Sequence, residues 1–275
     1  MLQIEPLTPL FAASIRGIDL RETLPDPDFQ AIRDAFERYS VLVFPDQPIG
    51  DDAQIAFSER FGPLETTRAG ANGAGGKLIV LTNLDADGAI IPPTDRQVLN
   101  NRANQFWHHD SSFKPNPARA SLLSGRRTPA EGGNTEFASL RAAYAALPEA
   151  WKAEVAGRHA IHDFGWSRSR VDAALVSEAE RQAWPPVRQP MVQAGTALYL
   201  GAHARAVEGM ADAAGRELVD RLMEFSTRPR FTYSHRWAPG DLVLWDNQAV
   251  LHRATPFRNA DVPRHMVRTT IASLA

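Results

Sequence analysis

A histidine and an aspartate near the middle of the chain have the types and spacing of metal ligands. His108 and Asp110 are two residues apart. Side chains two apart on an extended strand share a face, whereas the intervening His109 points to the opposite face. An imidazole and a carboxylate so placed supply two of the three ligands of a facial two-histidine, one-carboxylate iron site. Because His-x-Asp pairs also occur by chance, the motif alone does not exclude a structural histidine.

The C-terminal part of the chain supplies the remaining groups that such a site needs. His252 offers a second imidazole, and Arg264 and Arg268 are four residues apart. On a strand, this spacing places both arginines on one face about 13 Å apart. Taken alone, the pair is best interpreted as two solvated surface arginines. Together with the other candidates, we prefer two inward arginines, which require anionic partners in an apolar pocket.

Short strands and inserted helices are the elements expected to position these residues. Hydrophobic periodicity and turn residues predict helices at 28–40, 51–61, 140–147, 150–156 and 208–226. Strands are predicted at 41–44, 78–83, 231–237, 242–245 and 266–271, whereas 92–104 is expected to be irregular. No change of composition marks a linker. We therefore expect a single domain, residues 1–275, mainly β with helical insertions around a barrel or jelly roll.

Composition excludes several classes of function. The chain has 30 basic and 32 acidic residues, a formal charge of −2, so it lacks the basic excess that nucleic acid or an anionic membrane attracts. It contains no cysteine, which excludes disulfides, thiolate metal sites and a cysteine nucleophile. No apolar run approaches the ~20 residues of a membrane span, and no signal peptide is visible. We therefore expect a cytoplasmic protein.

The combined pattern resembles the taurine dioxygenase/2,4-dichlorophenoxyacetate dioxygenase (TauD/TfdA) family of iron(II)- and 2-oxoglutarate-dependent oxygenases. The resemblance covers nearly the whole chain and is strongest for the 2,4-dichlorophenoxyacetate branch. It rests on Asn104-Gln105-Phe106-Trp107-His108-His109-Asp110 and on the segments 40–44, 61–65, 132–137 and 201–204. It implies a double-stranded β-helix, the cupin-like form of the jelly roll.

The resemblance also implies a role for each candidate residue. His108, Asp110 and His252 match the iron ligands, which leave positions for 2-oxoglutarate and oxygen. Arg264 matches the arginine that binds the distal carboxylate of 2-oxoglutarate, Thr135 donates a hydrogen bond to it, and Asn104 contacts bound organic acids near the metal. Arg268 matches the arginine that holds the anionic end of the prime substrate. Ascorbate is the reductant such enzymes use, and family members are often homo-oligomers.

The reaction implied by the resemblance is oxidation of a small anionic substrate, with an aryloxyalkanoate such as 2,4-dichlorophenoxyacetate preferred. Hydroxylation between the ether oxygen and the carboxylate gives an unstable hemiacetal, which collapses to a phenol and glyoxylate while 2-oxoglutarate becomes succinate and carbon dioxide. The alternatives are a taurine or alkylsulfonate dioxygenase, a sulfate-ester dioxygenase, and an oxygenase of another carboxylic acid. A cupin-like binding protein without turnover is the non-enzymatic alternative.

The sequence departs from the branch around the prime substrate. Ala206 stands where the branch has a second histidine, and Ile90 stands where it has a lysine. Arg68, in the Gly-rich segment 66–76, is expected to replace a nearby lysine, and the segment itself is a candidate lid. His203 is a further candidate for the substrate pocket, with a structural hydrogen bond as the alternative. These departures leave open which acid is oxidised, and with what stereochemical preference.

Overall fold

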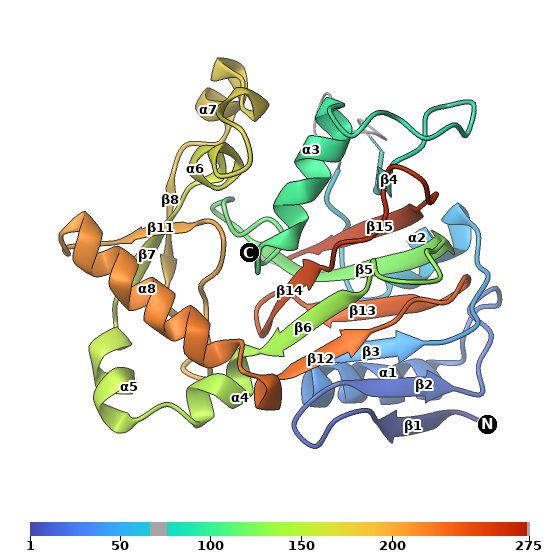
Figure 1. The fold of residues 1–275 in the computed structure, drawn as a ribbon. Helices are drawn as coiled ribbons and strands as arrows, with labels where there is room; N and C mark the ends of the chain where they lie inside the picture. The colour runs from blue at the N-terminus through green and yellow to red at the C-terminus, as the bar shows by residue number, and fades with distance from the viewer. Residues whose placement is uncertain (67–75, 274–275) are drawn as a thin grey trace.

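A seven-stranded sheet forms the centre of the computed structural model, which describes residues 1–66 and 76–273. Its strand order is β1-β2-β3-β13-β5-β15-β4, and every neighbouring pair is antiparallel except β2 and β3 (Figure 1). Strands from the two ends of the chain therefore alternate in one sheet. The strands are β1 (Gln3–Pro6), β2 (Ala13–Arg16), β3 (Val41–Phe44), β4 (Leu78–Thr82), β5 (Ala118–Arg127), β13 (Leu242–Asp246) and β15 (His265–Ala272).

A three-stranded sheet faces the large one and completes the jelly roll. It consists of β12 (Thr232–His235), β6 (Thr135–Ser139) and β14 (Val250–Ala254), all antiparallel. Phe137 of this sheet packs against Trp245 of the large sheet, with ring centroids 5.6 Å apart, and both belong to one buried apolar cluster. The two facing sheets confirm the expected mainly-β core with helical insertions. The metal-ligand candidates from both halves of the chain lie on or beside these two sheets.

Helices and smaller sheets surround the core. The outer face of the large sheet is covered by α1 (Asp26–Tyr39) and α2 (Asp51–Glu59), whose buried side chains share an apolar cluster with that sheet. A second group lies beside the smaller sheet: α4 (Leu140–Ala145), α5 (Glu149–Val155), α8 (Asp212–Ser226), β9 (Val192–Gln193), β10 (Ala197–Leu198), and the sheet of β11 (Ala204–Val207), β7 (His159–His162) and β8 (Val187–Pro190). None of the described helices is long and apolar enough to cross a bilayer.

Two segments differ from the sequence-based expectation. The stretch at 92–104 contains a helix, α3 (Arg96–Arg102), and a 3-10 turn, η1 (Ala103–Gln105). The Asp95 side chain accepts a hydrogen bond from the amide of Gln97 and caps α3, so the missed signal was an N-cap residue in a polar run. The segment after Phe106 is not a continuous strand. Only His108 pairs, through an isolated bridge, and the chain turns at Ser111, whose φ of 55° is left-handed.

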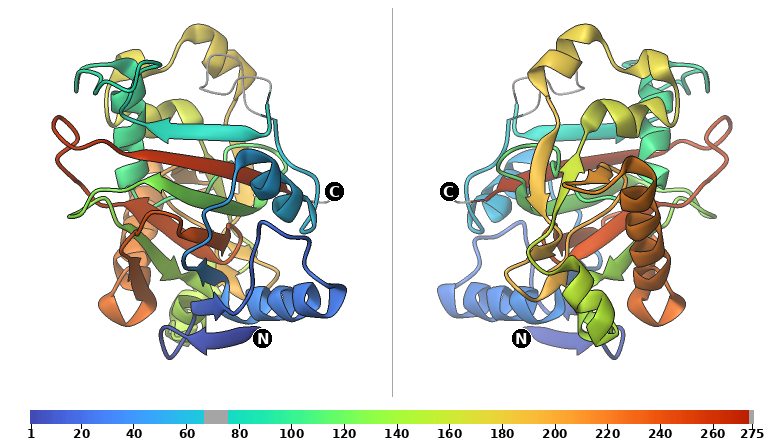
Figure 2. Two further views of the ribbon diagram at one scale, coloured as in Figure 1. Left: turned by 90° about the vertical axis from the view of Figure 1, so that its right-hand side faces the viewer. Right: turned by 90° about the vertical axis from the view of Figure 1, so that its left-hand side faces the viewer.

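Two short helices stand at the end of the molecule opposite α1. They are α6 (Phe164–Ser169) and α7 (Glu178–Ala183), with the 3-10 turn η2 (Ala173–Leu175) between them; η3 (Pro229–Phe231) precedes β12. Figure 2 shows α1 beside the N-terminal strands and the yellow 164–183 region at the far end. Ser177 and Glu180 form a capping box at the start of α7, another local signal that periodicity alone overlooks.

A buried carboxylate joins the large sheet to the helices and yields a stability prediction. Asp246 is fully buried and pairs with Arg119 at 2.5 Å and with Arg141 at 3.0 Å. Replacing Asp246 with asparagine removes the charge that both guanidinium groups face, so we expect a loss of about 3 kcal/mol in the free energy of unfolding. Urea denaturation measures this loss. The exposed pair of Arg216 and Asp220 is the control: D220N should change stability by less than ~1 kcal/mol. If Asp246→Asn lowered the free energy of unfolding no more than the D220N control does, the prediction would be contradicted.

Candidate metal centre and co-substrate pocket

Three side chains converge on one point between the two sheets. Each of His108, Asp110 and His252 offers a ligand atom, and these atoms all lie within 4.8 Å of one another. The Nε2 atom of His108 is 3.9 Å from one carboxylate oxygen of Asp110, and the Nε2 atom of His252 is 3.7 Å from the other. All three residues are buried. The structure therefore brings together the three predicted ligands.

Main-chain hydrogen bonds position the ligands. His108 and His252 form an antiparallel bridge in which each amide donates to the carbonyl of the other, at 3.0 and 2.9 Å. His252 lies on β14, so this bridge fixes the His108 segment against the smaller sheet. The amide of Asp110 donates to the side-chain oxygen of Asn247 at 3.2 Å, just before the left-handed turn at Ser111. Asp110 and His108 thus approach each other through a bridge and a turn rather than through one strand.

The protonation of the three side chains suits a divalent metal. The Nδ1 atom of His108 lies 2.8 Å from the carbonyl oxygen of Phe106, so Nδ1 carries the proton and Nε2 keeps its lone pair. Burial lowers the pKa of His108 and of His252, which keeps both imidazoles neutral. Two neutral imidazoles and a carboxylate fit the facial donor set of an iron(II) site.

The carboxylate ligand is held in its charged form by its neighbours. Burial by itself raises the pKa of Asp110, but the charge of Arg268, the adjacent imidazoles and a hydrogen bond from Ser121 together hold it well below its usual range. The Ser121 hydroxyl donates to one carboxylate oxygen at 2.7 Å, and the Nη1 of Arg268 donates to the other. Such outer contacts orient the carboxylate for a metal.

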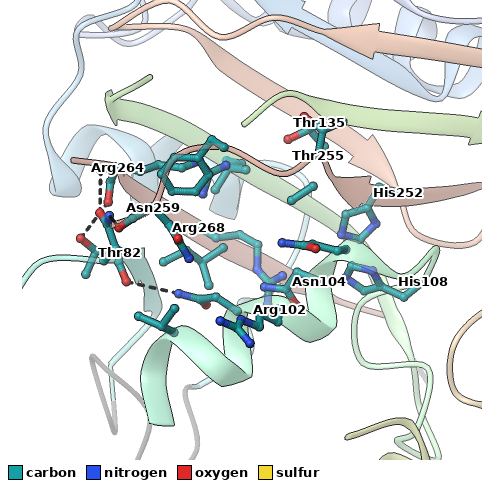
Figure 3. Close-up of a pocket in the computed structure, with 18 of the residues that line it drawn as sticks. Thr82, Arg102, Asn104, His108, Thr135, His252, Thr255, Asn259, Arg264 and Arg268 are labelled. Atoms are coloured by element: carbon teal, nitrogen blue, oxygen red, sulfur yellow. Dashed lines mark hydrogen bonds between the residues drawn. The ribbon is translucent and has the colours of Figure 1, made fainter. Parts of the chain in front are cut away.

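A pocket extends from the two histidines toward the start of β15. Figure 3 shows His108 and His252 at one end, Arg264 at the other, and Arg268 and Asn104 between them. Both apolar and polar groups line the pocket. Besides His108, His252, Arg264 and Arg268, they are Leu81, Thr82, Asn83, Val98, Asn101, Arg102, Asn104, Gln105, Leu123, Thr135, Trp245, Ala254, Thr255, Phe257 and Asn259. The pocket combines a metal site with cationic groups in one space.

The guanidinium group at the far end of the pocket has the environment of an anion-binding residue. Within residues 1–66 and 76–273, no acidic side chain forms an ion pair with Arg264, and its solvent-inaccessible Nε has no hydrogen-bond partner. Burial lowers the pKa of Arg264 to about 10, which leaves it charged at neutral pH. Its main chain is fixed by Asn83 and Thr82, at 2.7 and 2.9 Å. A buried cation of this kind calls for an anionic ligand.

The other predicted co-substrate residues line the same pocket. Thr135 opens β6, and its hydroxyl oxygen accepts a hydrogen bond from the indole of Trp237 at 3.0 Å. Its hydroxyl proton is therefore available to an acceptor in the pocket. Asn104 belongs to η1, which leads directly into the ligand segment. Arg268 lies on β15, paired with Leu123 of the neighbouring strand.

One predicted substrate residue lies outside this pocket, and another lies outside the described residues. His203 is buried just before β11, and its Nδ1 is 3.2 Å from the hydroxyl of Ser112. It does not line the pocket of Figure 3, although its ring contacts Phe113 at 5.1 Å, three residues after the carboxylate ligand. Arg68, most of the Gly-rich segment and the lid expected there lie outside the described residues.

Sequence reasoning missed several residues that support the site. Ser121, Asn247 and Asn83 orient Asp110 and Arg264, and Arg102 lines the pocket from α3. Ser121 and Asn83 carry no local signal, because each reaches its partner only through strand pairing. Arg102 could have been found from the Asp95 cap, which predicts the helix that presents it.

Comparison with known proteins agrees with this site. Residues 3–270 match the family described as taurine catabolism dioxygenase TauD, TfdA family. The chain is 45% identical over 258 residues, 90% of each chain, to the alpha-ketoglutarate-dependent 2,4-dichlorophenoxyacetate dioxygenase of Cupriavidus pinatubonensis. It is 34% identical to the (S)-phenoxypropionate/alpha-ketoglutarate-dioxygenase of Sphingobium herbicidovorans, over 92% of this chain and 89% of the relative. The crystal structure of AAD-2 with Mn(II) and N-oxalylglycine has a TM-score of 0.91 and 37% identity, covering 100% of this chain and 98% of its own.

The fold and the facial ligand set thus define a dioxygenase core, and the chain belongs to the TauD/TfdA family. It is a 2-oxoglutarate-dependent dioxygenase that uses iron(II), as the sequence resemblance implied. A small-molecule substrate is consistent with this class.

Proposed function

We propose that this dioxygenase hydroxylates an aryloxyalkanoate such as 2,4-dichlorophenoxyacetate, forming a phenol, glyoxylate, succinate and carbon dioxide. The observation that carries the proposal is the pair of arginines in one pocket with the metal triad. Arg264 is remote from the triad and has no acidic partner in the described chain, whereas Arg268 contacts a ligand directly. Two separated cations suit two anions, a keto acid and a second acid.

The first arginine and its neighbours bind and orient the co-substrate. Arg264 takes the distal carboxylate of 2-oxoglutarate, and Thr135 donates its hydroxyl proton to the same group. Asn104 lies near the end of the pocket where the acid approaches the ligands. When bound at His108, Asp110 and His252, iron(II) with oxygen and 2-oxoglutarate supplies the oxidation that converts a C–H bond into C–OH.

The second arginine determines which substrate carbon is oxidised. Arg268 already donates to Asp110, so a carboxylate held by its remaining N–H groups lies next to a metal ligand. In an aryloxyacetate, the carbon beside that carboxylate also carries the ether oxygen. Its hydroxylation gives a hemiacetal; the hydroxyl oxygen becomes the aldehyde of glyoxylate, and the aryloxy group leaves with the proton as a phenol.

The named relatives support an aryloxy acid over a sulfonate. Proteins named for 2,4-dichlorophenoxyacetate and for (S)-phenoxypropionate share 45% and 34% identity with this chain. Phenol release and succinate formation from aryloxyacetates and aryloxypropionates test the proposal, with taurine, an alkyl sulfate and a simple carboxylic acid in parallel. Succinate formation coupled to sulfite release from taurine, with no phenol from any aryloxy acid, would contradict it.

Removing the second arginine should selectively weaken binding of the prime substrate. In Arg268→Ala, the substrate carboxylate loses a charge-assisted partner, which costs about 2–5 kcal/mol, or at least ~30-fold in Kd. Substrate binding is measured by titration with the metal and 2-oxoglutarate present, and the 2-oxoglutarate KM is measured alongside. An equal loss of affinity for both acids would contradict this division of roles. Arg268→Lys keeps the charge without the planar fork and should have an intermediate Kd.

Two further expectations belong to this proposal. We infer a homo-oligomer and a cytoplasmic location, both from the family resemblance and composition. Light scattering after size-exclusion chromatography measures the oligomeric state, and a monomer at all concentrations would contradict the first expectation.

A further inference from the structure

A third arginine lines the pocket where the pocket meets solvent. Arg102 lies in the last turn of α3, and Figure 3 shows it beside Asn104 on the lining of the pocket. Among the described residues that line the pocket, Arg102 and Gln105 are the exposed ones, and the others are buried or half-buried. Both exposed residues belong to the continuous segment of α3 and η1. The pocket therefore opens beside this segment.

The lining of the pocket is positively charged. Three of the described lining residues are arginines and none of them is acidic, although the chain as a whole has a formal charge of −2. Arg268 already contacts the carboxylate of Asp110, so Arg264 and Arg102 carry the charge that no carboxylate balances. A cleft lined by charge of one sign concentrates ligands of the opposite sign and raises their association rates. The 2-oxoglutarate that this enzyme uses is a dianion.

The guanidinium of Arg102 has no strong partner in the described part of the chain. No acidic side chain among those residues forms an ion pair with it, and its Nη2 donates to the carbonyl oxygen of Pro93 only at 3.5 Å. The helix that carries it is nevertheless fixed, because the side-chain amides of Gln97 and Asn101 donate to the carbonyl oxygen of Thr82 at 2.7 and 3.2 Å. Arg102 is thus an unneutralised cation at a fixed place beside the opening.

We propose that Arg102 is an entry residue, which attracts anionic ligands to the opening of the pocket and does not hold them once they are bound. A charge at the edge of a binding site changes the association rate and its salt dependence, whereas a buried partner changes the dissociation rate. Arg264 and Arg268 have the buried role, and Arg102 has the exposed one. The inference applies to 2-oxoglutarate itself, so it is independent of which acid is the prime substrate.

Stopped-flow mixing of 2-oxoglutarate with the iron(II)-loaded protein in the absence of oxygen tests the proposal. The absorbance band of the iron(II)–keto acid complex reports binding, and its observed rate at several concentrations gives the association and dissociation rate constants. In Arg102→Gln, the association rate constant should fall roughly threefold at 0.01 M salt, where the Debye length is about 30 Å. At 1 M salt, where it is about 3 Å, the difference should disappear. The dissociation rate constant should stay within about twofold at both salt concentrations.

Two further variants separate charge from shape. Arg102→Glu reverses the charge, so its association rate constant should fall roughly tenfold at low salt. Arg102→Lys keeps the charge and should resemble the unsubstituted protein, because attraction at a distance does not need the planar guanidinium. Arg38→Gln is the matched control. Arg38 is exposed in the last turn of α1, which lies at the opposite end of the molecule from α3 in Figure 1, so this variant loses the same charge far from the pocket.

Each contrary result identifies a different error. An unchanged association rate in Arg102→Gln at low salt, or an equal decrease in Arg38→Gln, would overturn the proposal. Faster dissociation with unchanged association would show that Arg102 holds the bound acid, which also overturns an entry role. A decrease that persists at 1 M salt and in Arg102→Lys would mean that Arg102 acts through its shape. Failure of every aryloxy acid as a substrate would contradict the proposed function and leave this inference standing.

Discussion

Replacing Asp110 with alanine is expected to abolish iron binding and turnover together. The carboxylate is one of three ligands, and the two imidazoles that remain cannot form the facial set. Losing a residue that only hydrogen-bonds to a ligand typically lowers metal affinity 10- to 100-fold. Losing a ligand itself should therefore lower metal affinity by more than ~100-fold. Equilibrium dialysis followed by metal analysis measures iron binding, and succinate formation from 2-oxoglutarate measures turnover.

The control for this substitution removes an aspartate without touching the site. Asp220→Ala removes an exposed carboxylate of α8 that pairs with Arg216, so iron binding and succinate formation should stay within twofold of the unsubstituted protein. Stoichiometric iron in Asp110→Ala, or turnover within tenfold of normal, would show that the ligand assignment is wrong. His108→Ala should behave like Asp110→Ala.

Arg264→Ala should chiefly raise the concentration of 2-oxoglutarate that the enzyme requires. The guanidinium lies at the end of the pocket opposite the two histidines, and its partner on our assignment is the distal carboxylate of the keto acid. Losing one member of a desolvated, charge-assisted pair costs about 2–5 kcal/mol, a rise in KM of at least ~30-fold. Steady-state kinetics with varied 2-oxoglutarate measure the change.

The environment of Arg264 supplies an independent check. Because no described acidic group pairs with it and its Nε is orphaned, alanine at this position should not lower the melting temperature of the ligand-free protein by more than a few degrees. Arg264→Lys keeps the charge but cannot bind a carboxylate in bidentate fashion. Its KM for 2-oxoglutarate should therefore lie between that of the unsubstituted protein and that of Arg264→Ala. A normal KM with a large loss of kcat would contradict the assigned role.

Much of the scaffold follows from local periodicity. Phe29, Ile32 and Phe36 recur at helical spacing and are buried in α1, and the apolar run of β3 is buried throughout. The predicted helix before β3 begins two residues later than the observed one and ends one residue beyond it. The convergence of His108, Asp110 and His252 was also predictable, but only because the motif, the distant histidine and the arginine pair were considered together.

The rest of the site depends on contacts that no local pattern encodes. The expected strand through Asp110 was wrong, because the shared direction of His108 and Asp110 comes from a bridge to β14 and a left-handed turn. Ser121 reaches Asp110 from the middle of β5, where it resembles any other buried strand serine. The expectation that 92–104 is irregular failed because polarity was weighted above the cap at Asp95.

The reciprocal hydrogen bonds between His108 and His252 bear on how such a scaffold can diversify. Main-chain atoms hold the two segments together, so substitutions of nearby side chains can reshape the cavity without separating the ligands. Residues that line the pocket from α3, such as Val98 and Arg102, can be exchanged without altering these main-chain contacts. Related enzymes can therefore come to accept different substrates through substitutions in the pocket, while the residues that bind the metal stay in place.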